Sequence, residues 1–426
     1  MKKVYFCTLG CRVNQYESVS LCEMLIARGY TPTKRMADAD LVIVNTCAVT
    51  AESARKSAQA VRRGARLGVP VAVLGCASQL TPQKFFDIDG VVFVAGCGNK
   101  ASLIDFIDGN TDAKNSVSDV PDTFERLCIG DMTTELFSSC RAYVKIQDGC
   151  NCRCSYCTIP LARGRSRSRD ASDIIDEVKR LSEHGYREVE LTGIETGAYS
   201  LMPLGELIKR VSEINGIERI RLGSLSPNCI KPEFIEAIRQ TPQFMPHLHI
   251  SAQSGSKSVL SAMRRPYTAE MLYNAFDTIA AELPTFMVSV DLISGFPGET
   301  DDDFAATLDM VKKYRFLHVH GFPYSERAGT YAATMDCKIP VELRRHRNEI
   351  LLATAKEIHG GILQSKHGKE CEVLVERADR LSARGHTADY IECRITGSDF
   401  AVGDIISASV TDDDGEMLIA VGKDKR

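Results

Sequence analysis

The chain has 426 residues, of which 44% are hydrophobic and 25% charged, and its formal net charge is −4. This size accommodates two or three domains with buried cores, and the slightly acidic balance excludes binding of nucleic acid through global basicity. No apolar run approaches the roughly 20 residues of a membrane-spanning helix, and the first residues lack the features of a signal peptide. We therefore expect a cytoplasmic protein without a membrane partner.

Residues 1–110 predict a doubly wound parallel α/β domain. Apolar runs at 4–8, 41–45, 71–75 and 91–95 have the composition of strands, and segments at 17–29, 51–67 and 81–86 have the composition of helices. Continuously apolar strands that alternate with helices are typical of a parallel sheet covered on both faces. Residues 111–138 are polar and show little periodicity, which indicates a linker.

Residues 139–364 predict a second and larger α/β domain. Candidate strands lie at 142–147, 188–192, 219–223, 247–251, 286–292 and 316–320, with helical segments between them. Six strands joined by helical crossovers predict a partial (βα)6 barrel, in which functional residues gather at the C-terminal ends of the strands. Residues 365–426 contain short alternating strands at 372–375, 390–394, 405–410 and 417–421, which predict a small β-barrel.

Sixteen cysteines are many for a chain in a reducing compartment, where disulfides are rare. A cysteine group with regular spacing therefore indicates metal binding or redox chemistry, whereas an isolated cysteine is typically a small buried apolar residue.

The tightest cysteine group opens the second domain, in a loop after a predicted strand: Cys150, Cys152, Cys154 and Cys157. Thiolates at these intervals can converge on one iron–sulfur cluster. A zinc knuckle usually requires a second ligand pair of comparable spacing, and none follows nearby. The C-x3-C-x2-C spacing of Cys150, Cys154 and Cys157 resembles the radical S-adenosylmethionine (SAM) signature, in which one iron of a [4Fe-4S] cluster stays free for SAM. Cys152 falls outside the pattern, and the alternative set Cys152, Cys154 and Cys157 has poorer spacing.

Later residues in the same domain fit SAM binding. Gly193 and Glu195 follow the second predicted strand, where enzymes of that superfamily contact the SAM amino group, and Ser226 and Gln253 follow later strands. Each residue alone has an ordinary explanation in a turn. Their order after the cluster loop makes them candidate SAM-binding residues.

A second set of thiols follows the strands of the first domain. Cys11, Cys47 and Cys76 each come after a different predicted strand, and parallel strands bring their C-terminal ends to one edge of the sheet, where doubly wound folds bind ligands. These thiols are candidate ligands of a second cluster with one iron free. Cys97 also follows a strand and competes for that role, and burial without metal is the alternative for the set.

The order and flanks of Cys11, Cys47, Cys76, Cys150, Cys154 and Cys157 resemble the radical SAM methylthiotransferase family over the whole chain. The resemblance implies a methylthiotransferase domain at 1–110, a radical SAM core at 139–364 and a TRAM domain at 365–426. Residues 10–18 and 45–50 resemble the branch acting on threonylcarbamoyladenosine at tRNA position 37. The resemblance also implies that the product is 2-methylthio-N6-threonylcarbamoyladenosine and that the cofactors are two [4Fe-4S] clusters and SAM. It implies tRNA as partner and flavodoxin or ferredoxin as electron donor.

In the implied reaction the cofactors carry the chemistry and no side chain acts as a catalytic acid or base. The cluster at Cys150, Cys154 and Cys157 is expected to generate a 5′-deoxyadenosyl radical, and the second cluster to present sulfur to C2 of the adenine. Alternatives are methylthiolation of another tRNA adenosine or of a ribosomal-protein side chain, and a radical SAM enzyme with other sulfur chemistry. A non-catalytic RNA-binding iron–sulfur sensor is the alternative from another class.

Two features concern RNA contact. Residues 365–426 hold nine Lys or Arg against thirteen Asp or Glu, which makes the TRAM-like barrel a poor clamp for phosphate. Candidate phosphate contacts are instead the arginines directly after the cluster loop: Arg163, Arg165, Arg167 and Arg169. A solvated loop, or pairing with the SAM carboxylate or with internal acids, is the alternative for these arginines. Residues 322–330 are candidates for positioning the base, with an ordinary aromatic-lined approach to a helix as the alternative.

Overall fold

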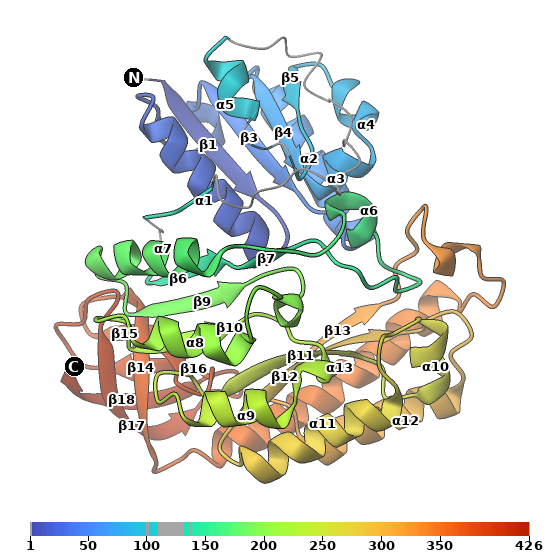
Figure 1. The fold of residues 1–426 in the computed structure, drawn as a ribbon, viewed down its shortest axis with the longest axis vertical. Helices are drawn as coiled ribbons and strands as arrows, with labels where there is room; N and C mark the ends of the chain where they lie inside the picture. Colours follow the sequence, from blue (N-terminus) through green and yellow to red (C-terminus); the bar gives the residue numbers. More distant parts are fainter. Residues whose placement is uncertain (1, 99, 101, 110–131, 136–138, 426) are drawn as a thin grey trace.

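A computed structural model describes residues 2–98, 100, 102–109, 132–135 and 139–425. Most of the predicted linker at 111–138 lies outside the described residues. In Figure 1 the N-terminal sheet stands above the second α/β unit, and the C-terminal barrel packs below and to the left. None of the helices in the described ranges combines the length and apolar character needed to cross a membrane.

The N-terminal unit is a parallel sheet in the order β2-β1-β3-β4-β5. One face packs on α1 (Arg12–Ile26) and α5 (Ser102–Ile107), and the other on α2 (Ala51–Arg66), α3 (Cys76–Leu80) and α4 (Gln83–Phe86). The doubly wound prediction is therefore confirmed. The strands are β1 (Lys3–Thr8), β2 (Thr31–Pro32), β3 (Leu41–Thr46), β4 (Val71–Gly75) and β5 (Val91–Val94).

The second unit contains six parallel strands in two runs, β6-β9-β10 and β11-β12-β13. Parallel bridges from Ile220 to Phe244 and from Leu225 to Ile250 join the runs, so the predicted partial (βα)6 barrel is confirmed. The strands are β6 (Arg141–Lys145), β9 (Glu188–Thr192), β10 (Arg219–Leu222), β11 (His247–Gln253), β12 (Met287–Ser294) and β13 (His318–Pro323). The helices are α7 (Ala171–Glu183), α8 (Leu204–Ser212), α9 (Pro232–Arg239), α10 (Lys257–Ala262), α11 (Ala269–Glu282), α12 (Asp301–Tyr314) and α13 (Val341–Gln364).

The interior of this partial barrel is polar. Alternate strand residues such as Val189, Leu248 and Val290 pack in the apolar core with the surrounding helices. Successive side chains of a strand point to opposite faces, so the intervening residues line the interior. They are Arg141, Tyr143, Glu188, Glu190, Arg219, Arg221, His247, His249, Ser289, Asp291, His318 and His320.

The C-terminal unit is a closed barrel in the order β14-β15-β16-β18-β17, as predicted. Its strands are β14 (Glu370–Ala378), β15 (Ser382–Thr387), β16 (Glu392–Thr396), β17 (Ile405–Asp413) and β18 (Leu418–Lys425). Sequence reasoning missed β15 because its buried positions hold Ala383, Gly385 and Thr387 and give no hydrophobic alternation. Gly385 is required there, since a Cβ would lie 1.7 Å from the Leu374 carbonyl oxygen.

Arginines inside the second unit hold the C-terminal barrel in place. Nη2 of Arg219 donates to the Glu372 carbonyl at 3.0 Å, and Nη2 of Arg221 donates to the Thr387 carbonyl at 2.9 Å. Both guanidinium groups share the fully buried carboxylate of Glu188 with Arg141. Burial alone would raise the pKa of Glu188, but Arg221, Arg141 and Arg219 lower it to about 2.

Replacing Glu188 tests this anchor. Glu188→Gln leaves buried guanidinium groups without their counter-charge, so it should destabilise the folded protein by about 3–5 kcal/mol. Urea unfolding of the wild type, the variant and the exposed-site control Glu183→Gln measures the effect. A carboxyl whose pKa is lower in the folded than in the unfolded protein stabilises the fold at pH values above its unfolded-state pKa. The difference in free energy of unfolding between the wild type and Glu188→Gln should therefore be constant above about pH 4.5 and shrink toward about pH 2. A difference no larger than that of the control variant would contradict the role of Glu188 as an anchor.

Candidate active site

The cluster loop runs from Gly149 to Cys157, between β7 (Gln147–Asp148) and α6 (Ile159–Arg163). Gly149 has a φ of +72°, and a Cβ there would lie 2.0 Å from the Arg165 carbonyl oxygen, so only glycine fits. The Cys152 amide donates to Sγ of Cys150 at 3.4 Å, and the Ile159 amide donates to Sγ of Cys157 at 3.5 Å. Amide hydrogen bonds of this kind stabilise thiolates, the form that binds iron.

Arg265 supplies a cation to the same loop and was missed from the sequence. Its Nη1 donates to Sγ of Cys154 at 3.1 Å and to the Tyr156 hydroxyl at 3.3 Å, and its Nη2 donates to the Ser251 carbonyl at 3.1 Å. Arg265 therefore connects the cluster loop to the C-terminal end of β11. It lies in a loop with no periodic pattern, so nothing in the sequence marked it.

The candidate SAM-binding residues converge on strand ends beside this loop. Oε1 of Glu195 accepts a hydrogen bond from the Ser226 amide at 3.0 Å, and the Glu195 amide donates to Oε1 of Gln147 at 2.9 Å. Gly193 permits this approach, since a Cβ there would lie 2.9 Å from the same Gln147 oxygen. Gln253 ends β11 at a bulge with a φ of +67°, a conformation that residues other than glycine rarely adopt.

Two polar groups in this set are incompletely compensated. Burial raises the pKa of the partly buried Glu195 against the opposing effect of the Ser226 amide, and within the described residues the buried hydroxyl of Ser226 has no hydrogen-bond partner. A partly buried carboxylate and an orphaned hydroxyl are costly unless a ligand satisfies them. An amino-acid moiety with an ammonium group fits this donor set.

The N-terminal thiols lie at one edge of their sheet, as predicted from the strand ends. Cys11 is the N-cap of α1, Cys47 follows β3 and Cys76 begins α3. Gly10, with a φ of +101°, lets the chain pass Cys47, because a Cβ at Gly10 would lie 3.0 Å from Sγ of Cys47. Cys11 is exposed, whereas Cys47 and Cys76 are buried.

Cys97 belongs to the same group of thiols. Its Sγ donates to Sγ of Cys76 at 3.5 Å, and its amide is held by Oε1 of Gln79 at 3.0 Å. The hydrogen bond from Cys97, together with the charges of Arg163 and Lys100, lowers the pKa of Cys76 to about 6 against the opposing effect of burial. The N-terminal site therefore offers four thiols, one more than the predicted set.

A buried charge network joins the two thiol sites. Arg163 on α6 lies six residues after Cys157, and its Nη1 contacts Oε1 of Glu17 at 3.0 Å and Oδ1 of Asp148 at 2.9 Å. Lys145 contacts both carboxylates at 2.9 Å, and Lys100 pairs with Glu17. Burial alone would raise the pKa of Glu17, but Arg163, Lys100 and Lys145 hold it well below its usual range.

This network has more cations than anions. Three buried cations, Arg163, Lys100 and Lys145, surround two carboxylates, Glu17 and Asp148, and the partly buried Arg167 also lies 3.9 Å from Asp148, which leaves an excess of positive charge. Nε of Arg163 is also buried, and none of the residues that the structure describes forms a hydrogen bond with it. Uncompensated buried charge is unfavourable, and the neighbouring thiols are the groups that can balance it as thiolates.

The predicted arginine contacts to RNA are partly wrong. Arg163 is inside the network, and Arg169 is buried in an ion pair with Glu177. Neither guanidinium is available to a phosphate, because both are paired with internal carboxylates. Pairing with internal acids is the alternative that the sequence left open for these arginines. Arg165 is exposed and Arg167 is partly buried near Asp148, so Arg165 is the member of the set that remains a candidate.

The described part of the predicted linker supports this interface. The amide and hydroxyl of Thr134 both donate to Oε1 of Glu177 at 2.9 Å, and the Tyr16 hydroxyl donates to the Met132 carbonyl. Residues 132–135 are thus packed between α1 and α7.

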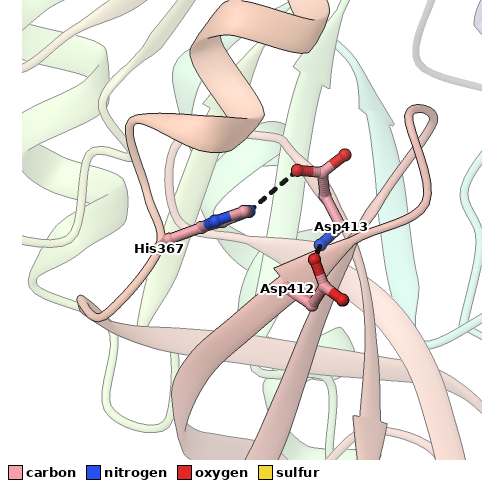
Figure 2. A group of neighbouring side chains, drawn as sticks. All are labelled: His367, Asp412 and Asp413. Atoms are coloured by element: carbon pink, nitrogen blue, oxygen red, sulfur yellow. Dashed lines mark hydrogen bonds and ion pairs between the residues drawn. The ribbon is translucent and has the colours of Figure 1, made fainter.

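A separate group of potential metal ligands lies on the C-terminal barrel (Figure 2): His367, Asp412 and Asp413. Nε2 of His367 contacts Oδ2 of Asp413 at 2.8 Å, and Oδ1 of Asp412 accepts the Asp413 amide at 2.9 Å. These contacts satisfy the side chains at the surface, and no further group points to a bound cation, so we assign no site there.

Family models match both halves of the site. Residues 144–311 match the radical SAM superfamily, and residues 3–98 match a family described as uncharacterized protein family UPF0004. The first match contains the cluster loop and the candidate SAM-binding residues, and the second contains the N-terminal thiols.

Curated relatives align over nearly the whole chain. The threonylcarbamoyladenosine tRNA methylthiotransferase MtaB of Bacillus subtilis is 33% identical over 424 residues, which cover 96% of this chain and 94% of the relative. MtaB of Chlamydia pneumoniae is 36% identical, covering 89% and 88%. The tRNA-2-methylthio-N(6)-dimethylallyladenosine synthase of Syntrophus aciditrophicus is 31% identical, covering 96% and 92%.

Among solved structures, the radical SAM methyltransferase TsrM of Kitasatospora setae has a similar fold. Its TM-score is 0.59 at 16% identity, with 78% of this chain and 77% of that chain covered. At this identity the similarity concerns the fold alone.

Proposed function

The chain belongs to the tRNA methylthiotransferase family of radical SAM enzymes, and we propose that it converts threonylcarbamoyladenosine at tRNA position 37 to its 2-methylthio derivative. The observation that carries the proposal is the proximity of the two thiol sites, which are joined through α6 and Arg163. Inserting a methylthio group into a C–H bond requires both a radical source and a sulfur source near one base. Relatives named for this substrate align over both sites.

The first site would hold a [4Fe-4S] cluster through Cys150, Cys154 and Cys157. Glu195 and Ser226 would hold the SAM amino group, beside Gly193 and with Gln253 at the neighbouring strand end, because the Ser226 hydroxyl has no hydrogen-bond partner among the described residues and burial raises the pKa of the neighbouring Glu195. When bound there, the cluster and SAM would supply a radical for activation of the substrate carbon, with a flavodoxin or ferredoxin as the proposed electron donor. Arg265 holds Cys154 in place and connects it to β11.

A second [4Fe-4S] cluster would be held by Cys11, Cys47 and Cys76. The excess positive charge around Arg163 and its unpartnered Nε support an anionic group at these thiols. The buried network formed by Glu17, Lys145 and Asp148 fixes the position of this site against α6.

The proposed activity is tested with anticodon stem-loop RNA carrying threonylcarbamoyladenosine. With SAM and a strong reductant, the anaerobically reconstituted enzyme should release 5′-deoxyadenosine, and the RNA digest should contain a nucleoside in which methylthio replaces hydrogen. Parallel reactions with dimethylallyladenosine RNA and with ribosomal protein separate the alternative substrates. Cluster-dependent RNA binding without 5′-deoxyadenosine would instead indicate an iron–sulfur sensor.

Iron content tests the two ligand sets. The reconstituted chain should hold about eight iron atoms, and replacing Cys11, Cys47 or Cys76 by Ala should leave about four. Cys97→Ala and Cys152→Ala are the matched controls in the two sites, and both should retain nearly all of the iron. A loss of half of the iron in Cys97→Ala, with full retention in Cys76→Ala, would assign the second cluster to a different trio.

Arg165 is the proposed phosphate contact next to the cluster loop. Arg165→Ala should reduce the slope of log affinity for the RNA against log salt concentration by about 0.7, because one fewer counter-ion is released. Arg380→Ala, which removes an exposed arginine of the C-terminal barrel, is the control and should leave the slope unchanged. An unchanged slope in Arg165→Ala would remove this residue from the RNA interface.

A further inference from the structure

One inner face of the second unit, formed by β11, β12 and β13, is polar and accessible. His249, Asp291 and His320 occupy neighbouring inward positions on these strands, and Phe322 follows His320 on the same face. On β13, the end strand of this sheet, His320 is exposed and Phe322 is 42% exposed. Their outward neighbour Gly321 packs against Leu351 and Leu352 of α13, so the exposed side is the inner one.

The polar groups of this face are incompletely paired. The rings of His249 and His320 are stacked with centroids 5.2 Å apart. Nε2 of His249 is buried and lies 3.1 Å from Oδ1 of Asp291, but among the described residues it has no hydrogen-bond partner in suitable alignment. A ligand with its own donors and acceptors would complete these groups.

The face lies between the two thiol sites. His249 is two residues before Ser251 on β11, and the Ser251 carbonyl accepts from Arg265, which also donates to Cys154. Two residues of a strand span about 7 Å. From the other site, Arg12, next to Cys11, enters the interior, where it pairs with Glu190 and donates to the Tyr390 hydroxyl at 2.6 Å.

Two kinds of adenosine occur in the names of the relatives, and they differ in the group on N6. A dimethylallyl group is a hydrocarbon and would bury His249, His320 and Asp291 without partners, which is costly. A threonylcarbamoyl group carries a carboxylate, a hydroxyl and urea N–H groups. It offers acceptors to the imidazoles and donors to the carboxylate.

We propose that His249, Asp291 and His320 bind the polar N6 substituent of the substrate adenosine and thereby select threonylcarbamoyladenosine over dimethylallyladenosine. This inference rests on the proposed function, which it makes more specific. The imidazoles donate to the threonyl carboxylate, and Asp291 accepts from the hydroxyl or a urea N–H. Phe322, one step nearer the strand end, offers its ring to the adenine, as aromatic side chains do with unstacked bases.

The test compares two stem-loop RNAs that differ only in the N6 group of the same adenosine. The reconstituted holoenzyme and the variants His249→Leu, His320→Leu and Asp291→Asn are measured for RNA affinity and for kcat/KM with each RNA. Each variant should lose about 10- to 100-fold in affinity and in kcat/KM for the threonylcarbamoyl RNA, with less than a twofold change for the dimethylallyl RNA. The exposed-helix variant His346→Leu is the matched control and should retain the wild-type ratio.

Iron content and SAM affinity should match the wild type in all variants, which separates recognition from misfolding. Equal losses with both RNAs, or no loss with the threonylcarbamoyl RNA, would overturn the proposal. Wild-type preference for the dimethylallyl RNA would overturn it as well. If the wild type binds the threonylcarbamoyl RNA selectively, loses this selectivity in the variants and yet forms no methylthio product, recognition stands and the proposed reaction fails.

Discussion

The buried ion group around Arg163 is the constraint on which the arrangement of the two thiol sites depends. Arg163 is six residues from Cys157 and contacts Glu17, which lies six residues after Cys11. The guanidinium thus joins two short chain segments, one that begins at Cys11 and one that begins at Cys157. Removing one partner of such a group leaves an uncompensated charge and costs several kcal/mol, so the two sites keep a fixed relation. Chemistry that transfers a group between cofactors requires this kind of preorganisation.

The same principle explains why the interior of the second unit is polar. Glu188 and Glu190 occupy alternate positions of a fully buried strand and are compensated by arginines from β6, β10 and, through Arg12, from the N-terminal unit. These ion pairs occupy the part of the interior next to the C-terminal barrel, where Tyr390 of that barrel stacks on His247. Toward the strand ends, Nε2 of His249 and Oγ of Ser226 have no hydrogen-bond partner among the described residues, as is also true of Oε2 of Glu188 and of Glu190 inside the ion pairs. The unsatisfied atoms outside the ion pairs are therefore the candidates for contact with a ligand.

Local patterns predicted the three architectures and the positions of the thiols, because strand ends and cysteine spacing are visible in short segments. The start of α1 was wrong by five residues, since Cys11 caps the helix without a typical capping side chain. Arg163 and Arg169 were misread because a run of arginines carries no information about burial, which depends on Glu17 from the N-terminal unit and on Glu177 from the following helix α7. Lys145, Glu190 and His249 stand at inward positions of apolar strands, and this exception to the apolar pattern was the available signal for the interior.

Charge distribution also bears on how RNA is recognised. The chain has a net charge of −4, its C-terminal barrel is acidic, and an excess positive charge is buried beside the N-terminal thiols. Cations paired with internal carboxylates attract phosphate only weakly at long range, because the field of each cation is offset by that of its adjacent anion. On the proposed function, discrimination must then come from the base itself. A single modified adenosine supplies that information through its N6 substituent, which is the part of the substrate that the face formed by His249, Asp291 and His320 complements.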